Sequence, residues 1–272
     1  MNYKFFMLLA IVILAFIGCN SNSTTENKAK NEAANPPKTR VAISKDPFVE
    51  KVEKAHNRYG FLSKTAIQFD ILLMFGGKER MNGKMTLLTN SSKGLIELQN
   101  GDKMYYVNDK VYYSPDIENE KRVRFNAYTW SYFFLFPFKL SDEGTVWSDY
   151  EPKTMNDKSY LVHKLTFKAG TGDAPDDWYV VYADEEKHLI DVAAYIVTAN
   201  KTQAEAEEDP HAIIYKNYKE VSGVPIATNW EFWGWTTKDG LTEQLGEATL
   251  SNLKFVEVED NLFEAPEGFK EI

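Results

Sequence analysis

The sequence predicts a mainly β fold in which one large antiparallel sheet is strongly curved. From residue 66 onwards, segments rich in β-branched and aromatic residues follow one another about every ten to twelve residues, with turn residues between them. Several of these segments are apolar on both faces, namely 71–75, 104–107, 191–197 and 229–235. A sheet with water on one face should alternate apolar and polar residues. Both faces must therefore be covered, which a sheet curved around helices or around a ligand cavity achieves.

Residues 1–18 predict a secretory signal peptide. Lys4 supplies the positive charge, and the apolar run over 5–17 is shorter than the roughly 20 residues that a membrane-spanning helix needs. The run ends in FIGC, in which Gly18 directly precedes Cys19, the single cysteine of the chain. This pattern resembles a bacterial lipobox, which implies cleavage before Cys19 and a thioether-linked lipid on it. The alternative is an ordinary signal peptide with a coincidental cysteine.

Residues 19–44 are expected to form the lipidated Cys19 and a flexible tether. The tether is rich in Asn, Ser, Thr, Lys and Ala, and it cannot bury enough apolar surface to offset the entropy lost on ordering. A second acyl chain such as palmitate would stabilise the anchor, because one chain alone holds a membrane only marginally. No acidic run of the kind that marks surface export in some lipoproteins follows Cys19. We therefore expect the periplasmic face of the outer membrane, within the cell envelope.

The folded β domain is expected over residues 45–272 and begins with a helix over 46–59. Asp46 can cap this helix, Pro47 takes the favoured first position, and Gly60 is a plausible stop. Strands are predicted over 66–75, 80–89, 93–99, 103–108, 110–115, 159–168, 178–183, 189–198, 211–221, 226–236 and 247–258. Polar, acidic loops cover 171–177 and 201–210, and the second could hold a short helix.

An aromatic segment over 124–144 separates two groups of strands. Pro137 and the charges of Lys139, Asp142 and Glu143 cut its apolar run far short of the length needed to cross a bilayer. We expect a short helix that ends or bends at Pro137 and serves as a lid or a plug. Its candidate cavity-lining or lid residues are Trp130, Phe133, Phe134 and Phe138, with Leu135 and Phe136 as alternates. Ordinary packing in a sealed core is the other interpretation.

Trp233 and Trp235 are the second group of candidates for the cavity or its lid. In a strand they share one face with Glu231, because alternate residues point the same way. Indole rings beside a carboxylate could stack on a sugar ring, so a glycan binder or a hydrolase is a further alternative. Core packing is the other use of both indoles.

Composition and motifs argue against catalysis, metals and nucleic acid. The 272-residue chain has a net charge of −9 and scattered Lys and Arg, whereas the phosphates of nucleic acid require a basic surface. The four His residues lack metal-binding spacing, the acidic loops lack the spacing of a calcium-binding loop, and no nucleophile motif such as GxSxG occurs. We therefore expect no catalytic residue, no metal and no cofactor.

The order of elements resembles the LolA/LolB-like superfamily. The resemblance rests on FPFKLSDEG (136–144), WYVVYADEEKHLIDVAAYI (178–196), YKEVSGVPIATNWEFW (218–233) and the closing LFEAPEGFKEI (262–272). It is a likeness of pattern over 46–272, shared with uncharacterised outer-membrane lipoproteins of Bacteroidetes. It implies an open half-barrel, covered by the N-terminal helix and the aromatic helical segment, whose concave apolar face binds acyl chains without catalysis. LolA itself lacks a lipid anchor, so an anchored chain is closer to LolB.

Together these observations predict a lipid-anchored envelope lipoprotein that binds or carries a hydrophobic ligand, a lipid or the acyl chain of a lipoprotein. The alternative is a non-catalytic accessory lipoprotein that docks on an envelope complex. The first function predicts a concave, mainly apolar pocket, and the second predicts a packed interior with an exposed aromatic patch. We expect a monomer, attachment to the membrane through the N-terminal lipid, and no nucleic-acid partner.

Overall fold

A single antiparallel sheet of 14 strands dominates the computed structural model of the chain, which describes residues 46–272 except 152 and 200. The strands are β1 (Ala66–Phe75), β2 (Lys78–Leu88), β3 (Lys93–Leu98), β4 (Lys103–Val107), β5 (Lys110–Tyr113), β6 (Thr145–Asp149), β7 (Thr154–Met155), β8 (Lys158–Phe167), β9 (Tyr179–Asp184), β10 (Ile190–Tyr195), β11 (His211–Val221), β12 (Val224–Thr236), β13 (Gly240–Val256) and β14 (Lys270–Glu271). The predicted signal peptide (1–18), Cys19 and the predicted tether (19–44) lie outside the described residues.

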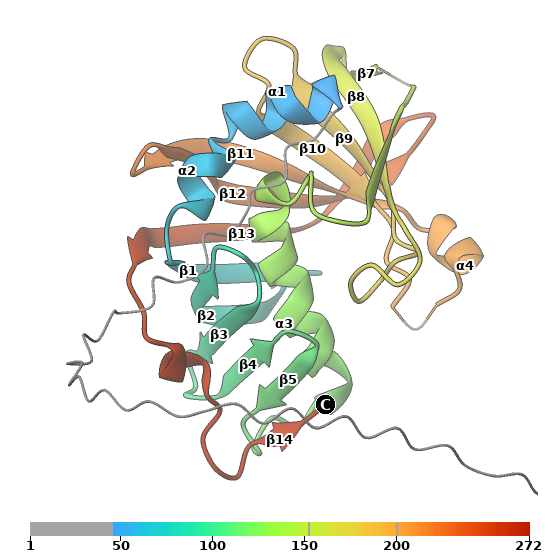
Figure 1. The fold of residues 1–272 in the computed structure, drawn as a ribbon. Helices are drawn as coiled ribbons and strands as arrows, with labels where there is room; N and C mark the ends of the chain where they lie inside the picture. The colour runs from blue at the N-terminus through green and yellow to red at the C-terminus, as the bar shows by residue number, and fades with distance from the viewer. Residues whose placement is uncertain (1–45, 152, 200) are drawn as a thin grey trace, which may run out of the picture. The chain divides into compact units, whose positions relative to one another are not determined.

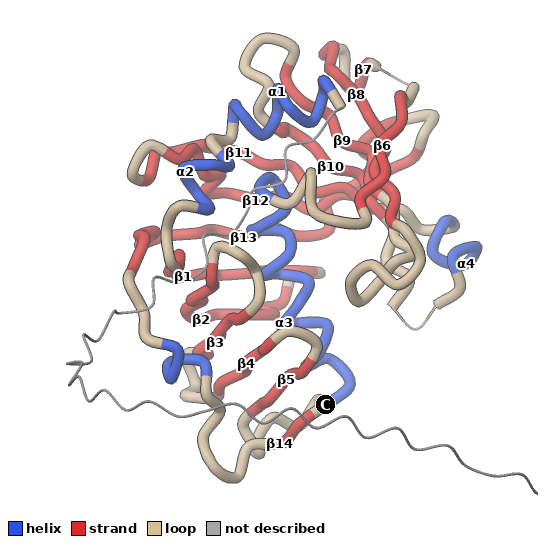
Figure 2. Tube along the Cα trace, in the orientation of Figure 1, coloured by secondary structure: helices blue, strands red, loops and turns tan. Residues whose placement is uncertain are grey.

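The sheet is open and curved. Its strands follow the order β14-β5-β4-β3-β2-β1-β13-β12-β11-β10-β9-β8-β6, with β7 paired to β8 beside this path, and the sheet does not close on itself. The helices are α1 (Pro47–Ala55), α2 (Arg58–Leu62), α3 (Glu120–Leu135), α4 (Gln203–Glu207) and the 3-10 turns η1 (Phe136–Phe138) and η2 (Asp260–Phe263). Figures 1 and 2 show the strands bending around α3, with α1 lying across the β8–β11 end. The predicted mainly β class and open curved sheet are therefore confirmed.

Most strands lie near their predicted positions, and β1 and β11 match them residue for residue. The sequence patterns did not indicate β6, β7 or β14. Each of these three strands is at most five residues long, which is too short for an alternating pattern to stand out. β13 also begins earlier than predicted, because its polar first residues continue the hairpin with β12.

The predicted first helix is broken into two. Asp46 caps α1 as expected, since its carboxylate accepts hydrogen bonds from the backbone N–H groups of Phe48 and Val49. Asn57 then adopts a left-handed backbone (φ 49°), and its side chain accepts from Gly60 N at 3.1 Å, which starts α2. The prediction of Gly60 as the stop was therefore wrong. A Cβ on Gly60 would lie 2.4 Å from Asn57 Nδ2, so glycine makes room for this cap.

Three apolar clusters explain why several strands are apolar on both faces. The inner cluster fills the concave face and includes side chains from β1, β9, β12 and α3. An outer cluster on β8–β12 includes Tyr182 of β9, Val192 of β10 and Ala206 of α4. A second outer cluster lies on β3–β5, where Phe263 and Phe269 of the C-terminal segment cover it. Short terminal and loop elements, rather than a second sheet, therefore shield the outer face.

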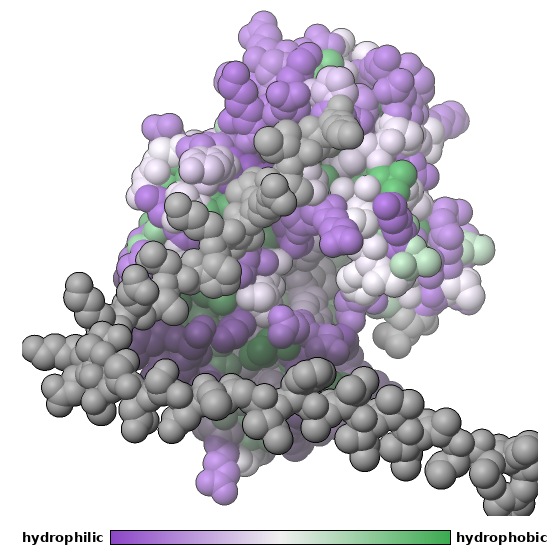
Figure 3. Space-filling view, in the orientation of Figure 1, coloured by the Kyte–Doolittle hydropathy of each residue, from purple (hydrophilic) through white to green (hydrophobic). Residues whose placement is uncertain are grey.

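Residues 71–75 depart from the two-sided pattern. Ile71 and Leu73 are buried on the concave face, but Leu72 between them is 41% exposed on the other face. No outer cluster in the described residues includes Leu72. Figure 3 shows that the visible surface is mainly hydrophilic, with small and separated apolar areas. An isolated exposed leucine of this kind is ordinary for a soluble surface.

Candidate functional site

Helix α3 lies in the concave face of the sheet and packs its aromatic side chains against the strands. Phe134 stacks on Phe69 of β1, with ring centroids 4.2 Å apart and planes inclined by 17°. Trp130 meets Phe232 of β12 at 5.7 Å, and Phe133 meets Tyr195 of β10 at 4.9 Å. Because these partners come from strands far apart in the sequence, α3 ties both halves of the curved sheet together.

The C-terminal end of α3 is anchored by buried polar groups. The Arg58 guanidinium donates from Nε to the Phe138 carbonyl at 2.8 Å and pairs with Glu53 at 3.1 Å and with Asp142 at 3.1 Å. Burial raises the pKa of the Glu53 carboxyl. Tyr215 Oη donates to the Phe133 carbonyl at 2.9 Å. Buried polar groups left without such partners would cost free energy, so this end of the helix is firmly held.

The N-terminal half of α3 is held by more exposed contacts. Arg124 pairs with Asp173 of the β8–β9 loop through Nη2 at 2.5 Å and donates from Nη1 to the Asp109 carbonyl at 2.8 Å. Tyr128 Oη donates to the carbonyl of Asn108, the neighbour of Asp109 in the β4–β5 turn, at 2.8 Å. The Arg124 guanidinium therefore bridges the β8–β9 loop and the β4–β5 turn. Surface pairs of this kind contribute at most about 1 kcal/mol each, so this half is the easier one to move.

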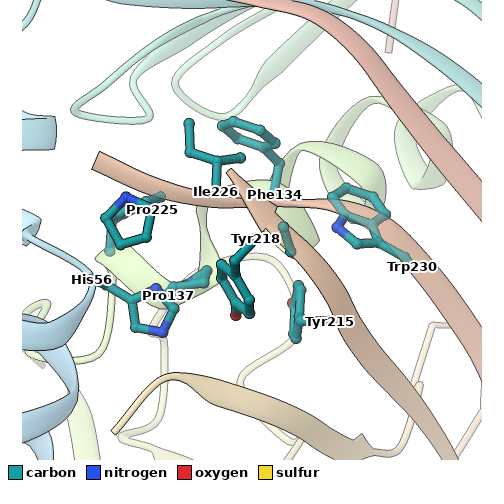
Figure 4. Close-up of a pocket in the computed structure, with 10 residues that line it drawn as sticks. His56, Phe134, Pro137, Tyr215, Tyr218, Pro225, Ile226 and Trp230 are labelled. Atoms are coloured by element: carbon teal, nitrogen blue, oxygen red, sulfur yellow. The ribbon is translucent and has the colours of Figure 1, made fainter. Parts of the chain in front are cut away.

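A small cavity lies beneath the C-terminal end of α3. Its volume is about 10 Å³, room for roughly one water molecule. The lining residues come from α3, η1, β11 and β12, together with His56, and Figure 4 shows Phe134 and Ile226 on one side and His56 on another. They are His56, Phe134, Pro137, Phe138, Tyr215, Tyr218, Pro225, Ile226, Ala227 and Trp230. The concave face is thus mainly apolar and is filled by α3.

His56 is the one titratable side chain of this cavity besides the two tyrosines. It is fully buried, and its Nε2 accepts a hydrogen bond from Ile190 N at 3.1 Å, so the ring is neutral with the proton on Nδ1. Burial lowers the pKa of the imidazole to about 3. Nδ1 has no hydrogen-bond partner among the described residues.

The sequence-predicted candidates fall into two separate places. Trp130, Phe133, Phe134 and Phe138 all lie in the inner cluster and are at most 7% exposed, as are the alternates Leu135 and Phe136. Trp235 instead lies in the outer cluster, where it meets Trp178 with ring centroids 6.1 Å apart. Trp233 pairs in register with Ala212 of the same outer cluster. The two strand tryptophans are therefore outside the concave face, and whether any of the six binds a ligand stays a prediction.

The outer face around Trp233 does not offer a sugar-stacking site. Glu231 pairs with Lys216 at 2.7 Å and accepts a hydrogen bond from Trp233 Nε1 at 3.1 Å. Trp235 is 3% exposed, so it has no free ring face for a sugar. The carboxylate is engaged and only one indole is partly accessible, which gives the glycan-binding and hydrolase alternatives no support.

Two acidic side chains of the loop 171–177 and one at the end of β9 make contacts that serve the fold. Asp173 pairs with Arg124, and Asp177 accepts hydrogen bonds from the backbone and the hydroxyl of Thr198. Asp184 accepts from two backbone N–H groups and pairs with Lys158 at 3.0 Å, contacts that lower the pKa of its carboxyl to about 2. Within residues 46–272, apart from 152 and 200, no three His, Cys, Asp or Glu side chains gather closely enough to hold a metal ion.

Two further features were missed at the sequence level. The sequence places His56 within the predicted first helix and Arg124 at the start of the aromatic segment, and it indicates no partner for either side chain. Their partners, Ile190 and Asp173, are respectively 134 and 49 residues away, and no local pattern indicates such contacts. None of the described helices is long and apolar enough to cross a bilayer.

Comparison with known proteins identifies the family and the fold. Residues 98–243 match the model of DUF6503, a family of unknown function. A LolA superfamily protein from Nitrosomonas europaea has a similar structure (TM-score 0.51, 9% identity), covering 79% of this chain and 97% of that chain. No curated protein matches the chain.

Two further solved structures agree. A DUF1329 family protein from Desulfovibrio piger gives a TM-score of 0.52 at 14% identity, covering 80% of this chain and 98% of that chain. A domain assigned to outer-membrane lipoprotein sorting from Vibrio parahaemolyticus gives a TM-score of 0.52 at 13% identity, covering 79% of this chain and 95% of that chain. The predicted resemblance to the LolA/LolB-like superfamily is therefore confirmed at the level of the fold.

Proposed function

The chain belongs to the DUF6503 family, whose function is unknown, and we propose that it is a lipid-anchored lipoprotein of the cell envelope that binds or carries a hydrophobic ligand. The ligand would be a lipid or the acyl chain of a lipoprotein, held without catalysis in the concave face of the sheet. One observation carries the proposal: the concave face of an open sheet is mainly apolar, and its middle is occupied by a single helix, α3.

An acyl chain would replace α3 in this face at little net cost. Burying about 14 methylenes of a palmitoyl chain contributes roughly 11 kcal/mol. Withdrawing four large side chains of α3 from the same face costs roughly 6–12 kcal/mol. These two burial free energies nearly cancel, so the replacement of α3 by an acyl chain would be reversible. A near-balanced exchange suits a protein that takes up a chain and later releases it.

The uneven anchoring of α3 indicates which part moves. Its C-terminal end is fixed by the buried Arg58 and Tyr215 contacts, whereas its N-terminal half depends on Arg124 and Tyr128 at the surface. We therefore expect the whole of α3 to tilt away from the sheet about this fixed end when a chain enters, with the N-terminal half moving furthest. In this role α3 fills the concave face of the free protein, as a plug, and would cover a bound acyl chain, as a lid.

The location is proposed from the sequence together with the fold. The predicted lipobox at Cys19 would anchor the mature protein, and the tether would place the domain near the outer membrane on its periplasmic face. The solved structures with this fold include a LolA superfamily protein and a domain assigned to outer-membrane lipoprotein sorting, which supports a cell-envelope role. We expect the protein to work as a monomer.

Native mass spectrometry of the full mature lipoprotein, extracted in mild detergent, tests this function. We expect retained lipid, and uptake of a fluorescent acyl ligand after delipidation. Phe134→Leu should raise ligand occupancy, because the ligand then displaces a smaller plug, and Trp233→Leu on the outer face should change nothing. A protein that neither retains nor exchanges lipid would contradict the proposal.

The filled interior favours a second candidate function. With a cavity of only about 10 Å³, the domain in this conformation could be an accessory lipoprotein that docks on an envelope complex. Crosslinking in intact cells, followed by purification from membranes, distinguishes the two functions. A stable partner without lipid exchange would support docking, and lipid exchange by the isolated monomer would support carriage.

A further inference from the structure

Three tyrosines lie in a row where α3 meets the β9–β10 part of the sheet. Tyr132 of α3 and Tyr179 of β9 have ring centroids 5.7 Å apart, and Tyr179 and Tyr195 of β10 have centroids 6.0 Å apart. Tyr179 is 6% exposed and Tyr195 is 5% exposed. The rings also contact the aromatic side chains Phe133 and Phe136 of the plug. This tyrosine row therefore joins the helix that we expect to move to the sheet that stays.

The hydroxyl groups of the tyrosine row are not used by the fold. Within the part of the chain that the structure describes, none of the three hydroxyls makes a hydrogen bond to protein, and none is completely shielded from solvent. Two other inner tyrosines behave differently: Tyr215 Oη donates to the Phe133 carbonyl at 2.9 Å, and Tyr218 Oη donates to the Ile190 carbonyl at 2.7 Å. The row thus presents three phenol hydroxyls at the edge of an apolar face, which is unusual because buried tyrosines normally find a partner.

Charges near the row decide what it can bind. Burial raises the pKa of all three phenols, reinforced by Asp142 and Asp177 at Tyr132 and by Asp177 at Tyr179 and Tyr195, so they remain neutral hydrogen-bond donors. Asp177 is held in place by Thr198, with hydrogen bonds of 2.8 Å and 2.7 Å. Arg58 and Lys139 pair with Asp142, and Arg124, eight residues before Tyr132 in α3, pairs with Asp173. An anionic head group would meet a fixed negative charge without a free cation to pair with it among these neighbours.

We propose that Tyr132, Tyr179 and Tyr195 form the head-group site of the ligand and accept an uncharged, oxygen-rich head, such as the ester and hydroxyl groups of an acylglycerol. Phenol hydroxyls donate to ester carbonyls and accept from alcohols, and the acyl chain would continue from this row into the face that Phe133 and Phe136 now fill. This inference rests on the proposed function, and it names the class of ligand.

Three probes with the same acyl chain test the inference on the full mature protein: monopalmitoylglycerol, palmitate and palmitoyl glycerol phosphate. Displacement of a fluorescent acyl ligand gives their relative affinities. We expect monopalmitoylglycerol to bind most tightly. Each Tyr→Phe change in the row should lower the affinity for monopalmitoylglycerol roughly fivefold, which corresponds to the loss of one neutral hydrogen bond. The affinity for palmitate should stay nearly unchanged. Tyr160→Phe, in the outer cluster, is the matched control.

The outcomes separate the two proposals. If no probe binds to the wild-type protein, the proposed function fails and the head-group site with it. If the probes bind but the triple Tyr→Phe variant, checked for native folding by thermal melting, keeps full affinity for monopalmitoylglycerol, only the head-group site is overturned. Tightest binding of the phosphate probe would likewise overturn the preference for an uncharged head.

Discussion

The phenyl ring of Phe134 in α3 stacks on that of Phe69 in β1, with ring centroids 4.2 Å apart. Phe134 also lines the small inner cavity, next to Trp230 and Ile226 (Figure 4). One side chain thus contributes both to the stability of the core and to the space that a ligand would need. The same relationship underlies the plug role that we propose for α3, because a side chain that fills the concave face in the free protein would have to leave it for an acyl chain to enter.

Replacing Phe134 by alanine should lower the free energy of unfolding by about 3–5 kcal/mol, the usual cost of removing a buried phenyl ring. Urea denaturation monitored by tryptophan fluorescence measures this change. Tyr59→Ala is the control, because that ring is 76% exposed and its loss should cost less than about 0.5 kcal/mol. A Phe134→Ala variant as stable as the control would show that α3 is not packed in the sheet.

Arg124→Ala should speed the entry of an acyl ligand with little effect on stability. The side chain bridges Asp173 and the Asp109 carbonyl at the surface, so its removal should cost at most about 1 kcal/mol of folding free energy while freeing the N-terminal half of α3. Stopped-flow mixing with a fluorescent fatty acid gives the rate. Lys216→Ala, which breaks a surface pair with Glu231 on the outer face, is the matched control. Equal rates in both variants would contradict a moving N-terminal half.

The sequence predicts the general fold better than it predicts the site. The strands from β1 to β5 follow clear turn signals such as Asn100–Asp102, and their positions were predicted well. The two faces of β12 could not be assigned to a cavity, because an alternating pattern separates Phe232 from Trp233 without telling which one faces α3. That choice depends on contacts such as Trp130 with Phe232, which are set only when distant segments pack.

Removing the buried cation Arg58 should be costly. Glu53 is 11% exposed at its side chain and lies 3.1 Å from Arg58 Nε, so Arg58→Leu leaves a largely buried carboxylate without its cation. We expect a loss of about 3–5 kcal/mol in the free energy of unfolding. Adding Glu53→Gln to Arg58→Leu should recover part of this loss, because the uncompensated charge is gone. Additive effects of the two substitutions in a double-mutant cycle would show that the pair is not coupled.

The buried His56 should make the folded state less stable in mild acid. Burial lowers the pKa of its imidazole from the usual value of about 6.5 to about 3, so between these values the unfolded chain binds a proton that the native chain does not. Stability from this group is therefore fully present above about pH 6.5 and decreases as the pH falls towards 3. At pH 5 the loss relative to pH 7 should be about 2 kcal/mol.

His56→Gln isolates this contribution from that of the carboxylates. Glutamine does not titrate, and its side-chain oxygen can still accept from Ile190 N, the partner of His56 Nε2. Urea denaturation of both proteins at pH 5 and pH 7 should show a drop in the wild type that exceeds the drop in the variant by about 2 kcal/mol. Equal drops would mean that the imidazole takes up a proton as readily in the native state as in the unfolded chain, which would contradict a buried, neutral His56.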